Sequence, residues 1–531
     1  MALPDITPEI RESTNVARGS LDKPQNSNRL LKRLLGIFGG IALGAIVYYA
    51  FPRGLSDSLV EALTKAAQSK DPAAVIDPVV AANNIAFTAA VAALMAVWWI
   101  FEAIPLAATA LVPLVTFPLF GVATFKATAT PYASDTIFLF MGGFFLALAM
   151  QRWNFHRRLA FVIVLLIGTK PKRMVLGFMV ATGFLSMWVS NTATAVMMLP
   201  IGISVLTAVG QVETKDGKMS NFGTALMLGI AYAASIASLS TLIGTPPNAL
   251  LRGYLQESHD ITLNFGQWML FATPLAWLFL LIAWQLLIRL YKPEMEEIPG
   301  GRELIRRQLK EMGPMSAQEK IVMIVFICAA LAWIIIPTFW PDGPISDAYI
   351  AMAVALILFL TPAHLRPDGI PILDWESAKE IPWDVLLLFG GGLSLAGMFG
   401  TSGLSNWIGD KASGMAGAPI IVIVAVLAAM VIFLTELTSN TATAAAFLPI
   451  IGSVAIGMGV DVQLLVIPVA LAATCAFMLP VATPPNAIAF GSGYIKIKQM
   501  VKAGLWLNLI GIVLITLWTM YLGPLTLGYG I

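Results

Sequence analysis

The sequence has few of the residues on which soluble domains, disulfide frameworks and metal sites depend. Only 12% of its 531 residues are charged, and it contains three histidines and two cysteines. The cysteines, Cys328 and Cys475, lie far apart in apolar segments, which excludes a disulfide framework or a cysteine metal motif. The net charge is only +2 and no basic stripe is present, so nothing indicates a nucleic-acid partner.

Apolar residues are abundant instead. They make up 58% of the chain, and the mean hydropathy is +0.81. Because a membrane helix needs about 20 mostly apolar residues, we expect an all-α integral membrane protein with roughly ten to twelve crossings. The candidate apolar runs are 33–51, 84–101, 104–122, 157–168, 173–207, 222–254, 266–291, 319–338, 346–362, 417–458, 462–492 and 503–524.

The beginning of the chain is polar. Residues 1–30 are mixed in charge and show no apolar region or small-residue cleavage site near the start, so we expect no cleaved signal peptide. Lys32 and Arg33 directly precede the first apolar run. Basic residues at this place favour a cytoplasmic N-terminus under the positive-inside rule.

Three sequence blocks occur twice in the same order. The string SNTATA at 190–195 recurs at 439–444, a shift of 249 positions. The same shift aligns DTIFLFMGGFFLA, from Asp135, with DVLLLFGGGLSLA, from Asp384. IGTPPNA at 243–249 recurs as VATPPNA at 481–487. A single copy of small polar residues would usually only pack between helices, but paired interruptions in two halves indicate a transporter binding site.

The interruptions supply ligands for ions. Unwound backbone at membrane depth is tolerated only where protein or a water-filled cavity covers it, and a proline pair forces such a break. Freed carbonyls, hydroxyls and Asn amides are hard oxygen ligands that suit a dehydrated Na⁺. The helix that resumes after each break turns its positive dipole end toward the cavity, which favours an anion there. No Arg or Lys falls within the strings, so helix dipoles and bound cations must balance the charge of an anion.

Three acidic residues lie near these blocks. The segments 135–151 and 384–400 are short for full crossings, so we expect each to begin a re-entrant hairpin, with Asp135 and Asp384 as N-caps. Proton carriage by these two residues is the alternative. Glu436, which precedes the second string, aligns with the apolar Met187. We therefore interpret Glu436 as a support for the site whose carboxylate is satisfied by neighbours.

At these blocks the chain resembles the divalent anion:sodium symporter family, which includes the bacterial dicarboxylate transporters. The resemblance rests on the two SNTATA strings, GTPPN at 244–248, ATPPN at 482–486 and the two Gly-rich segments, and it covers roughly 84–528. It implies a homodimer of chains with two inverted repeats, eleven transmembrane helices, two re-entrant hairpins, and scaffold and transport domains that work as an elevator.

The resemblance also implies the residues of the site. A first sodium site would use Ser186, Ser190, Asn191 and Gly244, and a second would use Thr435, Ser439, Asn440 and Ala482. The substrate carboxylates would be held by Asn191, Thr192, Thr245, Asn440, Thr441, Thr483 and Pro484. Sodium is then the coupling ion, and no organic cofactor is expected.

The expected organisation follows from these blocks. It comprises a cytoplasmic tail, a first helix with its connection, a first repeat, a polar linker and a second repeat, at 1–32, 33–83, 84–291, 292–318 and 319–531. We expect sodium-coupled symport of succinate, malate or fumarate across the cytoplasmic membrane. Exchange of dicarboxylates, or transport of tricarboxylate or sulfate, is the first alternative, and a cation/proton antiporter or channel is the second. An enzyme is not expected, because no nucleophile, base or cofactor motif lies in the polar core.

Overall fold

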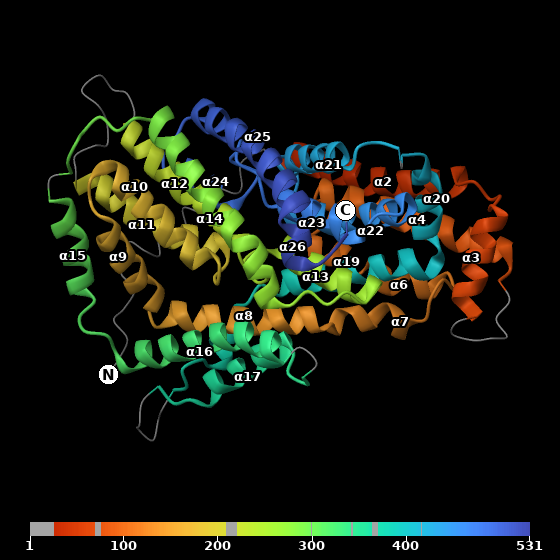
Figure 1. Cartoon of the computed structure of the whole chain (residues 1–531), viewed down its shortest axis with the longest axis horizontal. Coiled ribbons are helices and arrows are strands. Elements are labelled where there is room, and N and C mark those ends of the chain that lie inside the picture. The colour runs from red at the N-terminus through yellow and green to blue at the C-terminus, as the bar shows by residue number, and fades with distance from the viewer. Residues whose placement is uncertain are drawn as a thin grey trace.

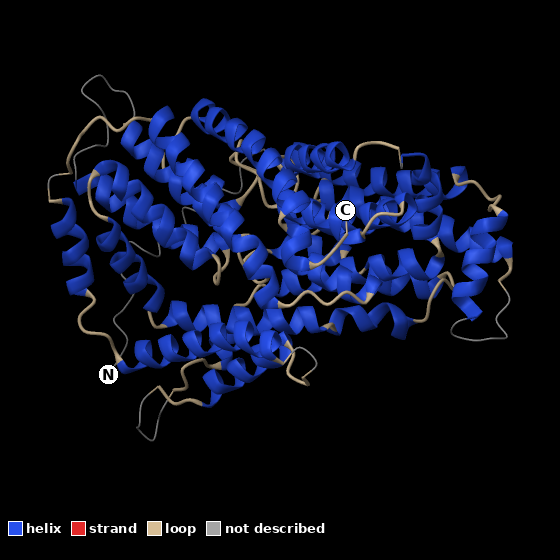
Figure 2. Cartoon of the chain, viewed as in Figure 1, coloured by secondary structure: helices blue, strands red, loops and turns tan. Residues whose placement is uncertain are grey.

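The computed structural model describes residues 26–68, 76–208, 220–298, 300–340, 343–363, 370–415 and 417–530, and in these residues the chain is almost entirely helical (Figure 2). Most of the expected tail, 1–32, lies outside the described residues. The α-helices are α2 (Asn26–Ala50), α3 (Asp57–Gln68), α4 (Pro78–Ile100), α5 (Leu106–Thr109), α6 (Val112–Leu119), α7 (Phe125–Ala129), α8 (Asp135–Arg152), α9 (Phe155–Ile167), α10 (Pro171–Ser186), α11 (Asn191–Ala208), α12 (Asn221–Ser238), α13 (Pro246–His259), α14 (Phe265–Leu290), α15 (Gly301–Glu311), α16 (Ala317–Phe339), α17 (Asp347–Leu360), α18 (Trp375–Ala378), α19 (Trp383–Ser402), α20 (Leu404–Ala412), α21 (Ile420–Thr435), α22 (Asn440–Met458), α23 (Val462–Ala473), α24 (Pro484–Gly491), α25 (Ile497–Tyr521) and α26 (Gly523–Leu527). Short 3₁₀ helices, η2 (Thr130–Ala133) and η3 (Ser413–Met415), complete the set.

Nine helices in the described part of the chain are long and apolar enough to cross a membrane. The remaining apolar helices of the described residues are shorter, and the four longest apolar runs of the sequence are each divided into two helices. The run 173–207 gives α10 and α11, and 222–254 gives α12 and α13. In the second half, 417–458 gives α21 and α22, and 462–492 gives α23 and α24. The chain is therefore a multi-pass membrane protein whose SNTATA strings and TPPN blocks lie where the long apolar runs break.

Boundaries of the divided helices in the second half lie at positions that correspond to boundaries of the first half in the duplicated sequence. Helices α10 and α21 both contain 16 residues and end at Ser186 and Thr435, one turn before each string. Helices α13 and α24 both begin with the proline pair of a TPPN block. Proline is well tolerated there, because the first turn of a helix needs no amide donor and the ring fixes a helical φ.

The segments that begin at Asp135 and Asp384 differ from the expectation. They form continuous helices, α8 with 18 residues and α19 with 20, and both belong to the spans long enough to cross. Ser134 and Pro382 occupy the N-cap positions, so the prediction that Asp135 and Asp384 are N-caps was wrong by one or two residues. Both carboxylates still lie in the first turn, where they favour the helix dipole.

The first string lies at the tip of a helical hairpin, and neighbouring glycines establish the direction of each helix. Met179 of α10 packs on Gly229 of α12, where an added Cβ would lie 3.0 Å from the Met179 side chain. Further along both helices, Gly183 packs on Ala237. Because the residue numbers of both helices increase in the same direction along this contact, α10 and α12 run parallel.

Helix α11 runs in the opposite direction. Gly202 of α11 packs on Met227 of α12, whereas Leu206, one turn further on, packs on Gly223. Since α11 is antiparallel to α12 and α10 is parallel to it, the chain reverses between α10 and α11. Figure 1 shows α10 and α11 side by side. The reversal thus occurs at 187–190, beside the first string, and not after residue 135.

The two halves exchange contacts around the centre of the molecule. Helix α11, which follows the first string, packs on α24 of the second half, and α22, which follows the second string, packs on α13 of the first half. Helix α8 packs along α17, and Figure 1 shows both at one side of the divided helices. This exchange brings the two strings and the two TPPN blocks toward a common region.

Candidate functional site

A single cavity of about 1100 Å³ is lined by both strings and both TPPN blocks. The expected site residues that line it are Ser190, Asn191, Thr192, Gly244, Thr245, Ser439, Asn440, Thr441, Ala482, Thr483 and Pro484. The two other expected residues, Ser186 and Thr435, do not line the cavity. Each instead hydrogen-bonds to the Asn that does. The duplicated blocks therefore meet at one place from opposite ends of the sequence.

The first turn, 187–190, separates α10 from α11. Ser186, the last residue of α10, is fully buried and donates to the Oδ1 of Asn191 at 2.8 Å and to the carbonyl of Ala234 at 2.6 Å. Ser190 accepts from the amide of Ala193 at 3.2 Å, which caps α11. Hydroxyl, amide and carbonyl oxygens therefore converge behind the tip, and this donor set fits a hard cation.

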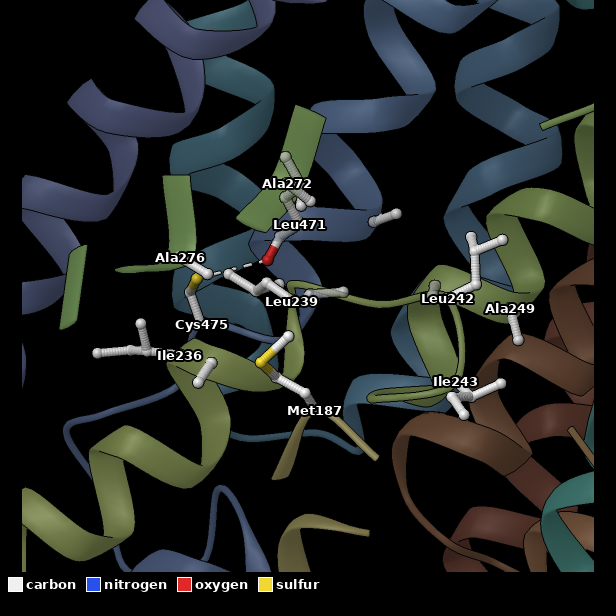
Figure 3. Packing of buried hydrophobic residues seen from close by; sticks show 14 of the residues in the cluster. Met187, Ile236, Leu239, Leu242, Ile243, Ala249, Ala272, Ala276, Leu471 and Cys475 are labelled. Atoms are coloured by element: carbon white, nitrogen blue, oxygen red, sulfur yellow. Dashed lines mark hydrogen bonds between the residues drawn. The ribbon is translucent and has the colours of Figure 1, made fainter. Parts of the chain in front are cut away.

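The first loop, 239–245, separates α12 from α13. Thr241 donates to the carbonyl of Met187 in the first turn, and Asn248 donates to the carbonyls of Leu239 and Thr241 at 3.2 and 2.8 Å. Figure 3 shows the apolar packing around this loop, where Leu239 and Leu242 lie among side chains of neighbouring helices. Loop and turn are thus tied together by hydrogen bonds that satisfy the unwound backbone.

Gly244 requires the absence of a side chain. A Cβ at this position would lie 2.2 Å from the carbonyl oxygen of Ser238, far inside normal contact. Ser238 in turn accepts from the Nδ2 of Asn191 at 3.3 Å and donates to the carbonyl of Ser235 at 2.7 Å. The close approach at Gly244 therefore positions the loop against the same group of oxygen atoms that surrounds Asn191.

The second turn, 436–439, repeats the core of the first. Thr435 is fully buried. Its hydroxyl hydrogen-bonds to the Oδ1 of Asn440 at 2.8 Å and to the carbonyl oxygen of Ala473 at 2.9 Å. Thr438 shares a hydrogen bond of 2.7 Å with Thr443 inside the second string. Each half thus provides one hydroxyl, one Asn oxygen and one carbonyl in the same arrangement.

Glu436 binds the backbone of the second loop, 474–483. Its carboxylate accepts from the amides of Phe477, Met478 and Leu479 at 2.7, 2.9 and 3.1 Å, and from the Nδ2 of Asn508 at 2.8 Å. Only 4% of Glu436 is exposed. Four donors satisfy the buried charge, as expected for a residue that supports the site.

The second loop is also tied to its own helix. Asn486 donates to the carbonyls of Ala476 and Leu479 at 3.0 and 3.1 Å, and Thr483 caps α24 by accepting from the amide of Asn486 at 3.3 Å. The loops of the two halves meet directly, where the hydroxyls of Thr245 and Thr474 lie 3.3 Å apart.

The electrostatics of the cavity come mainly from helix ends. Helices α11, α13, α22 and α24 all begin among its lining residues, so four positive dipole ends face one space. No Arg or Lys is among the described lining residues, as expected. Two carboxylates, Glu102 and Asp384, also line the cavity, whereas Asp135 is not among its lining residues.

Continuous helices add mostly apolar residues to the lining. These come from the end of α4, from α5, α8 and α19: Ile100, Phe101, Leu106, Phe140, Phe144, Val385 and Leu388. The lining thus combines the polar groups of the two strings and TPPN blocks with apolar side chains. Such a combination suits a small molecule with polar ends and an apolar carbon chain.

Several residues of the site were missed by sequence reasoning. Ser238 and Thr241 contact the first turn, and Asn508 contacts Glu436 across 72 positions of sequence. Asn508 lies inside the apolar run 503–524, and a lone amide there was a usable signal. Ser238 and Thr241 had no such signal, because small hydroxyl residues are common in membrane helices.

Two solved structures share the fold at low sequence identity. The YdaH transporter of Alcanivorax borkumensis has a TM-score of 0.51 and 15% identity, covering 81% of this chain and 98% of that one. MtrF of Neisseria gonorrhoeae, described among antimetabolite efflux pumps, has a TM-score of 0.51 and 14% identity, covering 77% and 85%. At these identities the likeness concerns the fold alone.

Sequence relatives are closer. A sodium-dependent dicarboxylate transporter, SdcS, of Staphylococcus saprophyticus is 45% identical over 451 residues, which covers 83% of this chain and 87% of the relative. The protein of the same name from Staphylococcus aureus USA300 is 44% identical over 445 residues, covering 82% and 86%. Residues 77–527 match the family description "Sodium:sulfate symporter transmembrane region". The chain therefore belongs to the sodium:sulfate symporter family, the divalent anion:sodium symporters that its duplicated strings resemble.

Proposed function

We propose that this protein is a secondary active transporter that carries C4-dicarboxylates such as succinate, malate and fumarate into the cell together with Na⁺. The observation that carries the proposal is the convergence of both strings and both TPPN blocks on one cavity. The family and the SdcS relatives are transporters and not enzymes, and the relatives are named for sodium and dicarboxylate.

Sodium would bind behind each string. We assign the first ion to Ser186, Ser190, Asn191 and Gly244, and the second to Thr435, Ser439, Asn440 and Ala482. The contacts of Ser186 and Thr435 with the Asn oxygens and with backbone carbonyls support these assignments. Each set offers neutral hard oxygens, which suit Na⁺ and leave its positive charge available to attract an anion.

The dicarboxylate would lie between the two strings. We assign its carboxylates to Asn191 and Thr192 on one side and to Asn440 and Thr441 on the other, with Thr245, Thr483 and Pro484 shaping the pocket. The helix ends at the cavity, together with two bound cations, would supply the positive field that no Arg or Lys provides. Binding of the anion would therefore depend on sodium.

Other cargoes fit the same lining chemistry. The neutral side chains of the cavity do not discriminate among dicarboxylate, tricarboxylate and sulfate, so the names of the relatives favour dicarboxylate. An exchanger would use the same residues without a sodium requirement. A cation/proton antiporter needs a titratable group at the breaks, and Glu436→Gln would then abolish pH-dependent exchange; its four hydrogen bonds favour a structural role instead.

The proposed mechanism is an elevator within a homodimer. The divided helices and hairpins would form the transport domain, in two inverted repeats, and move against a scaffold that includes α8 and α17. The bacterial origin of the relatives supports a location in the cytoplasmic membrane, and the basic residues Lys32 and Arg33 favour an N-terminus on the cytoplasmic side.

The test is uptake of labelled succinate into proteoliposomes, with and without an inward sodium gradient. We expect accumulation only with sodium. Uptake that is driven equally well by preloaded dicarboxylate in the absence of sodium would identify an exchanger and exclude symport.

Substitutions at the strings test the site. Asn191→Ala and Asn440→Ala should each abolish sodium-driven uptake, because each removes an oxygen assigned to both ion and substrate. Asn406→Ala, which changes an exposed Asn of α20 away from the cavity, serves as the control and should transport normally. Normal uptake by a folded Asn191→Ala or Asn440→Ala variant would exclude the proposed site.

A further inference from the structure

A buried ion pair joins α13, the helix that begins with the first TPPN block, to α17. Arg252 lies in α13, six residues after Pro246, and Asp347 is the first residue of α17. Their side chains are 6% and 1% exposed, and the Nη2 of Arg252 lies 3.6 Å from the Oδ2 of Asp347. Neither residue is among those that line the cavity.

Arg252 joins three separate segments. Its Nη1 donates to the hydroxyl of Thr136 in α8 at 3.0 Å, and its Nε donates to the carbonyl of Leu263 at 3.2 Å, while Nη2 faces Asp347. The fork of the guanidinium is thus used on α8, on α17 and on the connection before α14. Such a geometry requires Arg, since a Lys has one nitrogen and cannot reach all three partners.

Asp347 is held in a similar way. Its Oδ2 also accepts from the amide of Phe265 at 3.0 Å, and its backbone carbonyl accepts from the Nε1 of Trp333 at 3.0 Å. The rings of Phe265 and Trp333 stack at 4.9 Å, and Trp188, from the tip of the first hairpin, stacks on both. Asp347 therefore contacts a cluster of three stacked rings, one of which, Trp188, belongs to the first turn.

The pair connects two groups of helices that are each packed tightly within themselves. Gly142 of α8 touches α17 so closely that an added Cβ would lie 2.6 Å from the carbonyl oxygen of Ala351. On the other side, α13 packs on α22 and α23, which carry the second string and the second loop. Arg252 thus links α13, which begins at the cavity, to α8 and to α17, which packs along α8.

We propose that Arg252 and Asp347 are positioning residues whose ion pair latches the site-bearing helix α13 to α8 and α17 in this conformation and opens when the site moves. The inference rests on the proposed function, because it requires that the site changes position relative to α8 and α17. A buried charge is tolerated only with its partner, so separation of α13 from α17 must expose both groups to water or to new partners. The pair therefore makes this conformation one of two discrete states.

Removal of one partner has a consequence that depends on conformation. Asp347→Asn or Arg252→Gln leaves the other charge buried and unpaired in this state, which should shift molecules away from it. The double variant removes both charges, and it should restore the balance. A residue with a merely structural role would lower stability in all three variants without this pattern of loss and recovery.

The experiment reports the conformation by chemical labelling. In a background with Cys328→Ser and Cys475→Ala, Leu437→Cys provides a reporter, since Leu437 lines the cavity and is 72% exposed. Labelling by a membrane-impermeant maleimide is measured for folded protein in proteoliposomes. We expect either single variant to label about tenfold more slowly than the background, and the double variant to return to within about twofold of it.

Two further variants complete the test. Asp374→Asn breaks the ion pair between Arg152 of α8 and the connection before α18, on one side of the proposed interface, and should leave the labelling rate unchanged. Thr136→Val removes one partner of Arg252 without leaving a charge unpaired, and should slow labelling in the same direction by a smaller factor. Thr136→Val also provides the test of the latch if either single charge variant fails to fold.

Equal labelling of the background, Asp347→Asn, Arg252→Gln and Thr136→Val would overturn the latch. Slower labelling in the single variants without recovery in the double variant would also overturn it, because the effect would then not come from the pair. Sodium-driven succinate uptake by the unchanged protein is measured in parallel. Its absence would reject the proposed function, whereas normal uptake with unchanged labelling would reject only the latch.

Discussion

Beside each of the two turns, a buried hydroxyl, an Asn oxygen and a backbone carbonyl lie in the same arrangement. The groups that tie each turn to its neighbouring loop differ between the halves. In the first half, the hydroxyl of Thr241 binds the carbonyl of Met187. In the second half, the position of Met187 is taken by Glu436, which binds three consecutive amides of the second loop, including that of Leu479 at the position of Thr241. One loop is tied by a neutral hydroxyl and the other by a buried carboxylate.

The tips differ in their surroundings as well. Trp188 is 7% exposed and stacks on Phe265 and Trp333, whereas Leu437, at the equivalent position, is 72% exposed and lines the cavity. The first hairpin is thus packed against α14 and α16, while the tip of the second faces open space. Duplication thus preserved the hydroxyl, Asn and carbonyl contacts beside each string, whereas the groups that hold the turns diverged.

The largest effect is expected from removal of the carboxylate anchor. Glu436→Ala leaves the amides of Phe477, Met478 and Leu479 without their acceptor, at a cost on the order of 3–5 kcal/mol. We expect loss of sodium-driven uptake and a much lower unfolding temperature in detergent. Thr241→Val, which removes the hydroxyl bond between the first loop and the first turn, should cost only about 1 kcal/mol. Equal losses in the two variants would contradict the difference between the halves.

The second test uses the position that differs between Gly244 and Ala482. Gly244→Ala places a Cβ 2.2 Å from the carbonyl oxygen of Ser238 and must displace the first loop. We expect succinate uptake to fall by about tenfold or more and to need more sodium, since a small displacement of a binding group costs this much. The sodium dependence of uptake is the measurement.

The reverse change serves as the matched control. Ala482→Gly creates no overlap and adds backbone freedom, so uptake should stay within about threefold of the unchanged protein. If Gly244→Ala and Ala482→Gly behaved alike, the close approach in the first half would not matter for the site.

The smallest expected effect is that of Leu437→Ala, and it is compared with a substitution at the buried tip. Trp188→Leu removes the stacking on Phe265 and Trp333 and should destabilise the protein by about 2–4 kcal/mol, whereas Leu437→Ala at the exposed tip should change stability by less than about 0.5 kcal/mol. Thermal unfolding in detergent measures both. A larger loss at Leu437 than at Trp188 would reverse the assignment of the buried tip.

Much of the site could be predicted from the residues. Asn191, Asn440 and their neighbours were identified from repetition alone and line the cavity. The hairpins were placed after Asp135 and Asp384, because a Gly-rich apolar segment with an acidic start can be read either as a half-length or as a full helix. Only the contacts of α10, α11 and α12 place a reversal at the first string instead. Whether a polar interruption bends or reverses a chain is set by the helices around it.

The sequence by itself determined that the chain is a membrane protein, that it is duplicated, and which small polar residues interrupt its helices, because composition and repetition are local properties. The tertiary structure decided which interruptions face each other. The contacts of Glu436 with Asn508, of Thr245 with Thr474, and of Arg252 with Asp347 join residues 72, 229 and 95 positions apart. Such pairs form only where packed helices exclude water and bring polar groups of distant segments together, and no local pattern records which segments meet.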